Sequence, residues 1–154
     1  MYFAIVALLM FILPIASVFW DHAVSGAALP LFALVGKWFV FWSAGVRLIL
    51  AGLRQFFQPQ FTAKEIFGLR SDDALPIVRE LGIANFATGI VGVIALAKPS
   101  FVLPVATSAA IFYGIAGVRH ILAPERTTNE SVAMASDLFV CLALLAYLVI
   151  AAFP

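Results

Sequence analysis

Five long stretches that hold very few charges constrain what this chain can fold into. They run over 1–20, 27–53, 81–97, 101–122 and 136–153. A helix that crosses the hydrocarbon core of a bilayer needs about 20 mostly apolar residues. A soluble domain of this size has no interior for so much apolar surface, because 64% of the 154 residues are hydrophobic and only 11% are charged. The sequence therefore predicts an all-α bundle of five transmembrane helices, forming one integral membrane domain over 1–154.

The first stretch could be either a retained helix or a cleaved secretory signal. No Lys or Arg precedes its apolar run, no small-x-small cleavage site follows it, and it is longer than a usual signal core. We expect a retained helix. If it were removed, four spans would remain in the same orientation.

The connection over 54–80 is the only long one, and it mixes aromatic and aliphatic side chains with charges. This pattern is typical of an amphipathic segment that lies in the membrane interface. Thr62 is followed three residues later by Glu65, which has the pattern of a capping box and predicts a short helix that begins there.

The basic residues are divided unequally between the two sides of a five-span topology. One side collects seven: Arg47, Arg54, Lys64, Arg70, Arg79, Arg119 and Arg126. The other side holds Lys98 and Lys37, and Lys37 would either snorkel toward the surface or pair inside the bundle. The positive-inside rule predicts a multi-pass protein of a bacterial inner membrane with a cytoplasmic N-terminus and an external C-terminus. Arg47 shares a helix face with Arg54, and we expect it to contact lipid phosphates.

Small residues recur at helical spacing in two of the predicted spans. The stretch 81–97 carries Gly82, Asn85, Gly89, Gly92 and Ala95 on one face, and 101–122 carries Ala106, Ala110, Gly114 and Gly117. Such stripes let membrane helices approach closely. They predict that these two spans pack against each other as a tight hairpin.

Polar side chains gather at the cytoplasmic ends of the last three spans. The candidate ligand-binding residues are Glu80, Asn85, Tyr113, His120 and Asp137. Ionisable groups in membrane spans are costly and are candidates for function. We expect Glu80 and His120 at similar depth, and Asp137 at the start of the last helix.

Two interpretations of this polar group stay open. It could be a structural latch, in which Asp137 caps its helix and Glu80 pairs with an arginine. It could instead bind a ligand or transfer protons, since one histidine lies near two carboxylates. The spacing matches no metal site, and no catalytic or cofactor motif is present, so we expect neither a metal nor a cofactor.

Four runs of the sequence resemble a family of small uncharacterised bacterial polytopic membrane proteins that carries a domain-of-unknown-function label. These runs are KWFVFWSAGVRLILAGLRQFFQPQFTAKEIFG, PIVRELGIANFATGIVG, FYGIAGVRH and NESVAMASDLFV. The resemblance covers roughly 37–140. It implies a helical inner-membrane protein without an established activity, and it assigns no catalytic role to any residue.

The sequence favours a non-enzymatic integral membrane protein, such as an accessory subunit or a lipid-associated scaffold. The alternatives are a small-molecule carrier or binding protein with a polar intramembrane site, and a membrane-embedded enzyme acting on a lipid or quinone. The enzyme would require Glu80 and His120 within hydrogen-bond reach beside a lipid-accessible cavity. Expected partners are membrane lipids, a second copy of the chain or a larger membrane complex. A net charge of +1 predicts no nucleic-acid partner.

Overall fold

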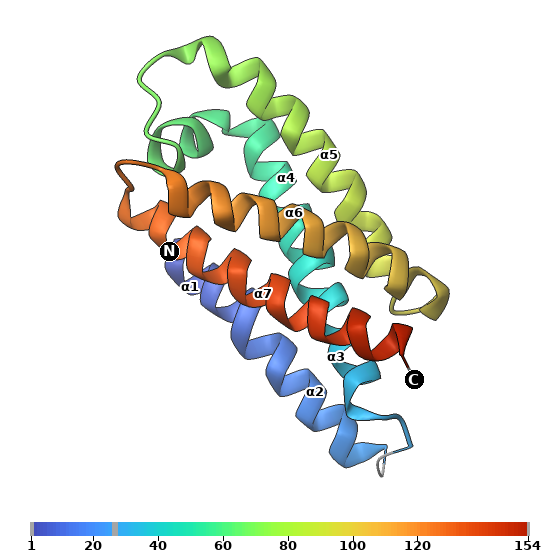
Figure 1. The fold of residues 1–154 in the computed structure, drawn as a ribbon. Coiled ribbons are helices and arrows are strands. Elements are labelled where there is room, and N and C mark those ends of the chain that lie inside the picture. Colours follow the sequence, from blue (N-terminus) through green and yellow to red (C-terminus); the bar gives the residue numbers. More distant parts are fainter. Residues whose placement is uncertain (1, 26–27, 154) are drawn as a thin grey trace.

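The computed structural model describes residues 2–25 and 28–153, and every regular element in these segments is a helix (Figure 1). We call each of the five long continuous helical segments a rod. The first rod consists of α1 (Tyr2–Ala7), η1 (Leu8–Ile12) and α2 (Leu13–Val24), and the second of α3 (Leu31–Phe39), η2 (Val40–Val46) and α4 (Arg47–Phe57). The other elements are η3 (Phe61–Ile66), η4 (Asp72–Ala74), α5 (Leu75–Ile94), η5 (Pro99–Phe101), α6 (Val102–Leu122) and α7 (Thr128–Ala152). The turns η1, η2 and η3 are π-helical.

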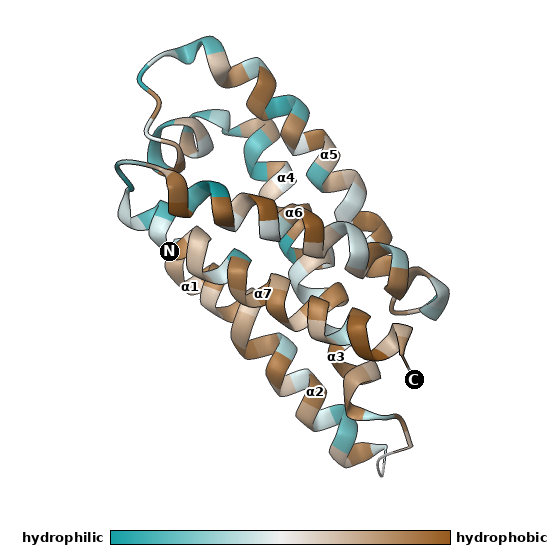
Figure 2. Ribbon diagram, in the orientation of Figure 1, coloured by the Kyte–Doolittle hydropathy of each residue, from teal (hydrophilic) through white to brown (hydrophobic). Residues whose placement is uncertain are grey.

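Five helical segments are long and apolar enough to cross a membrane, which confirms the predicted all-α fold with five spans. They are Tyr2–Val24, Leu31–Phe57, Asp72–Ile94, Pro99–Leu122 and Thr128–Ala152. Hydrophilic residues gather at the end of the bundle that holds Tyr2, the connection 58–74 and the loop 123–127 (Figure 2). We call this the Tyr2 end.

The last helix begins eight residues earlier than the apolar stretch that predicts it, at Thr128 instead of 136. The hydroxyl of Thr127 accepts a hydrogen bond from the backbone N–H of Glu130 (3.0 Å) and so caps the helix. Polar residues can form the first turns of a helix before the apolar part begins. Asp137 therefore lies inside α7 and does not cap it, which corrects the expected position.

The connection after α4 carries the turn η3, but the predicted capping box at Thr62 is wrong. Thr62 is buried inside η3, and Gln60 precedes the turn without a side-chain cap. The hydroxyl of Thr127 donates to the carbonyl of Glu65 (2.9 Å), which joins the connection to the start of α7. A capping pattern thus exists in this chain, at Thr127 and Glu130.

The glycine stripe of α5 packs against the second rod and not against α6. A Cβ on Gly82 would lie 2.9 Å from the carbonyl oxygen of Gly52, and one on Gly92 would lie 2.8 Å from the Cα of Gly45. The small face of α6 packs against α7, where Gly117 meets Leu138. The predicted hairpin between the third and fourth spans is therefore wrong, because periodicity identifies a close-packing face and not the helix that it meets.

Lys37 pairs at the end of the bundle opposite to Tyr2. Its ammonium lies 2.6 Å from a carboxylate oxygen of Asp21, which also accepts a hydrogen bond from the Trp38 indole (2.9 Å). Lys37 therefore has an ion-pair partner, but the pair lies at the end of the bundle, where the Lys37 side chain is 31% exposed, and not in its interior. The ion pair joins α2 to α3.

The crossing of α4 and α5 should not tolerate a side chain. Gly52→Ala places a Cβ 2.5 Å from the carbonyl oxygen of Gly82, which is rigid backbone, so we expect a loss of about 1–3 kcal/mol in the free energy of unfolding. Thermal unfolding in mild detergent measures the change. The control is Gly114→Ala, whose Cβ would meet only the movable Sγ of Cys141 at 3.0 Å. Equal effects of the two substitutions would contradict this account of the crossing.

Candidate functional site

A cavity of about 170 Å³ lies within the bundle at its Tyr2 end. All five rods contribute to its wall. Four of the five predicted ligand-binding residues line it: Asn85, Tyr113, His120 and Asp137. Further polar side chains in the wall come from Arg47, Gln55 and Arg119.

Glu80 does not belong to this group. Its side chain is exposed, and it is not part of the cavity wall. Glu80 and Asn85 are five residues apart on α5, which corresponds to about 140° around a helix. Since Asn85 faces the interior, Glu80 faces outward.

The Asn85 side chain is hydrogen-bonded to Gln55, a residue that no sequence pattern identifies. Its amide donates a hydrogen bond to the Gln55 side-chain oxygen (2.8 Å) across the seam between α5 and α4. Asn85 is 6% exposed, so this bond satisfies a polar group that burial would otherwise penalise. It holds α5 to α4 at the cavity.

Tyr113 connects α6 to the π-helical turns of the first two rods. Its hydroxyl donates to the carbonyl of Ser43 in η2 (2.5 Å), and the Ser43 hydroxyl donates to the carbonyl of Leu9 in η1 (3.3 Å). Both side chains are buried. The π-helical geometry alters the carbonyl positions of a helix, and such turns occur often at functional sites. Here two of these carbonyls accept hydrogen bonds from neighbouring side chains.

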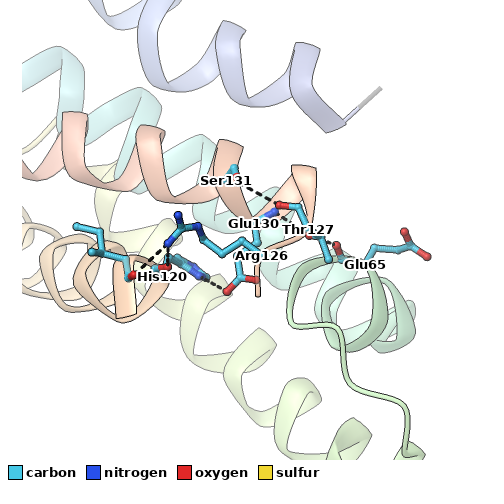
Figure 3. A network of polar contacts seen from close by, with 7 residues as sticks. Glu65, His120, Arg126, Thr127, Glu130 and Ser131 are labelled. Atoms are coloured by element: carbon cyan, nitrogen blue, oxygen red, sulfur yellow. Dashed lines mark hydrogen bonds and ion pairs between the residues drawn. The ribbon is translucent and has the colours of Figure 1, made fainter. Parts of the chain in front are cut away.

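His120 forms a buried pair with Glu130 and not with Glu80 (Figure 3). Its Nδ1 lies 2.8 Å from Glu130 Oε1, and their side chains are 6% and 5% exposed. The Arg126 guanidinium donates hydrogen bonds to the backbone carbonyls of His120 (3.1 Å) and Ile121 (2.9 Å), and so caps the C-terminal end of α6. The pair joins α6 to α7 beside the cavity, whose wall includes His120. The only signal for Glu130 in the sequence is its position three residues after Thr127.

Three charged side chains of the cavity wall have no ion-pair partner in the described part of the chain: Arg47, Arg119 and Asp137. Arg119 is exposed, whereas Arg47 on α4 and Asp137 on α7 are half-buried. The Nε of Arg47 is also buried without a hydrogen-bond partner. Because burying a charge without a partner is costly, these two groups mark the place where a polar ligand would be held.

Metal binding finds no support in this geometry. Across 2–25 and 28–153, no group of three or more His, Cys, Asp or Glu side chains could hold a metal ion. What the wall can offer is a cationic donor, a carboxylate acceptor and neutral hydrogen-bonding groups.

These features define a class of protein: an all-helical protein with five helices that could span a membrane and a cavity whose wall carries several polar side chains. The sequence matches a family described as a family of unknown function (DUF6790) over residues 2–153, and the chain belongs to this family. The match confirms the resemblance to an uncharacterised family. No curated protein and no solved structure matches the chain.

The latch between His120 and Glu130 should stabilise the fold. Glu130→Leu leaves the buried His120 ring without its partner, so we expect a loss of about 1–3 kcal/mol and a lower yield of folded protein. Unfolding temperature in detergent is the measurement. Glu125→Leu, exposed in the loop just before α7, is the control and should have little effect. An unchanged unfolding temperature for Glu130→Leu would show that the pair stabilises nothing.

Proposed function

We propose that this protein is a non-enzymatic membrane protein that binds a small polar molecule or headgroup in the cavity at its Tyr2 end. The observation that carries the proposal is the presence of two half-buried charges without an ion-pair partner among the described residues, Arg47 and Asp137, in the wall of one cavity. A protein that only needed a stable bundle would lose nothing by replacing them with apolar residues, since buried charges seldom add stability.

The size of the cavity limits what it holds. Drug-sized ligands occupy pockets of about 300–1,000 Å³, whereas a water molecule takes about 30 Å³ in the liquid. A cavity of about 170 Å³ therefore suits a small polar molecule or the headgroup of a larger one.

The other interpretations receive less support from the geometry. Two features favour a scaffold or accessory subunit: the absence of catalytic motifs and the small-residue stripes. The α5 stripe, however, packs against the second rod of the same chain, so it is not available to a partner protein. The membrane-embedded enzyme requires Glu80 beside His120, whereas His120 is engaged by Glu130 and Glu80 is exposed.

We further propose that the Tyr2 end faces the cytoplasm of a bacterium and that the first helix is retained. The Tyr2 end carries most of the basic residues, which favours a cytoplasmic location. The first helix supplies Val6 and Met10 to the buried core, and Tyr2 lines the cavity. Removing the first helix would take away the part of the cavity wall that Tyr2 forms.

A bound molecule should be detectable without knowing its identity. We expect native mass spectrometry of the protein, purified from its membrane in mild detergent, to show a non-protein mass that Asp137→Asn and Arg47→Gln each remove. Asp73→Asn, at an exposed position, should keep it. A mass retained in all three variants, or absent from the native protein, would contradict binding in this cavity.

Reporter fusions test the orientation. Alkaline phosphatase, which is active only outside the cytoplasm, should be active when fused after Phe153 and inactive when fused after Ala123. A fluorescent protein that matures only in the cytoplasm should give the opposite pattern. Phosphatase activity at Ala123 would place the cavity on the external side.

A further inference from the structure

We infer that the ligand of this cavity is a lipid with a zwitterionic phosphate–ammonium headgroup, whose hydrocarbon chain leaves the bundle sideways between α5 and α6. This inference rests on the proposed function and names the class of molecule. It depends on two independent observations: a lateral extension of the cavity, and the pairing of opposite charges in its wall.

A second cavity of about 220 Å³ lies between α5 and α6 and adjoins the first one. Four residues line both of them: Leu48, Leu81, Asn85 and Phe112. The second cavity reaches Ala84 and Ser108, whose side chains are exposed on the outer surface of the bundle. In a bilayer this surface faces lipid, so the polar cavity has a lateral exit toward the hydrocarbon.

The lateral cleft, like the first cavity, presents mainly apolar surface to whatever occupies it. Leucine, alanine and phenylalanine side chains form most of its wall. The hydroxyl of Thr88 is engaged by the carbonyl of Ala84 (2.9 Å), so Thr88 can present its methyl group. A hydrocarbon chain fits such a wall, whereas a water-soluble molecule would gain nothing from it.

The charges in the polar cavity require a ligand with two different ends. Arg47 needs an acceptor for its unpartnered Nε, and a phosphate oxygen is the acceptor that guanidinium groups bind well. The Tyr2 hydroxyl, also buried and unpartnered, is a further donor in the same wall. Asp137 is a carboxylate, which accepts and so requires a donor such as an ammonium N–H. A phosphate joined to a primary ammonium satisfies both sides, and the exposed Arg119 guanidinium is a further cationic donor in the same wall.

The same zwitterion exists as a lipid headgroup and as free phosphoethanolamine, and the test separates the two sources. Native mass spectrometry of the detergent-purified protein measures binding of four added probes. These are phosphatidylethanolamine, phosphatidylglycerol and phosphatidylcholine with identical chains, and free phosphoethanolamine. Phosphatidylglycerol lacks the cation, and phosphatidylcholine lacks an N–H donor.

We expect phosphatidylethanolamine to bind about tenfold or more tightly than the other three probes, because each of them loses a charge-assisted hydrogen bond or the hydrocarbon chain. Asp137→Asn should weaken the binding of phosphatidylethanolamine about tenfold and remove the difference in affinity between this lipid and phosphatidylcholine. Asp73→Asn should leave the affinity for both lipids unchanged. Arg47→Gln should weaken the binding of both lipids. It provides a second variant if Asp137→Asn fails to fold.

The lateral exit has its own matched pair of variants on α5. Ala84→Leu fills the cleft between α5 and α6 and should weaken the binding of phosphatidylethanolamine about tenfold. Ala87→Leu, which is exposed on the same helix but outside the cleft, should leave this binding unchanged. Equal binding of the three lipids would overturn the inference. So would tight binding of free phosphoethanolamine that Ala84→Leu leaves unchanged, although the proposed function would then stand. Binding of no probe, together with no bound mass in the native protein, would overturn both.

Discussion

The backbone contact between α4 and α5 determines how the rest of this structure is arranged. At Gly52, Gly82 and Gly89 the two helices approach so closely that a Cβ would lie 2.5–2.9 Å from backbone atoms of the other helix. In a bilayer, where hydrophobicity does not drive helices together, such close packing supplies much of the attraction. Because α5 is held on α4, it does not close against α6, and the cleft beside Asn85 remains. The same contact that stabilises the fold thus opens its cavity to the side.

The polar groups of the cavity wall fall into two kinds. Asn85, Tyr113 and His120 each have a partner within the protein, from Gln55, Ser43 and Glu130 respectively. These bonds join α5 to α4, α6 to η2, and α6 to α7, so they hold the wall in place. Among the described residues, Arg47, Arg119 and Asp137 have no ion-pair partner; Arg119 is exposed, and the half-buried Arg47 and Asp137 face the same space from α4 and α7. The first kind explains the architecture, and the second kind is available to a ligand.

The sequence predicts the five spans, the close-packing face of α5 and four of the residues around the cavity. These depend on helical period and hydropathy, which are local properties. It does not predict that the Gly82–Gly92 face meets α4, because several neighbours in a bundle could accept such a face. It misplaces Asp137 because a capped polar turn can precede the apolar part of a helix. The sequence places Glu80 among the candidate ligand-binding residues because of its expected depth in the membrane. Glu80 and Asn85 nevertheless point to different sides of the helix, because they are five residues apart.

In the proposed complex, Arg47 and Asp137 hold opposite ends of a lipid headgroup whose hydrocarbon chain lies between α5 and α6. An experimental structure of the protein in a lipid nanodisc containing phosphatidylethanolamine tests this claim most directly. We predict elongated non-protein density that starts between Arg47 and Asp137, passes Asn85 and leaves the bundle beside Ala84. A bundle in which Arg47 and Asp137 form a direct ion pair, with α5 and α6 packed together and no density between them, would contradict the account.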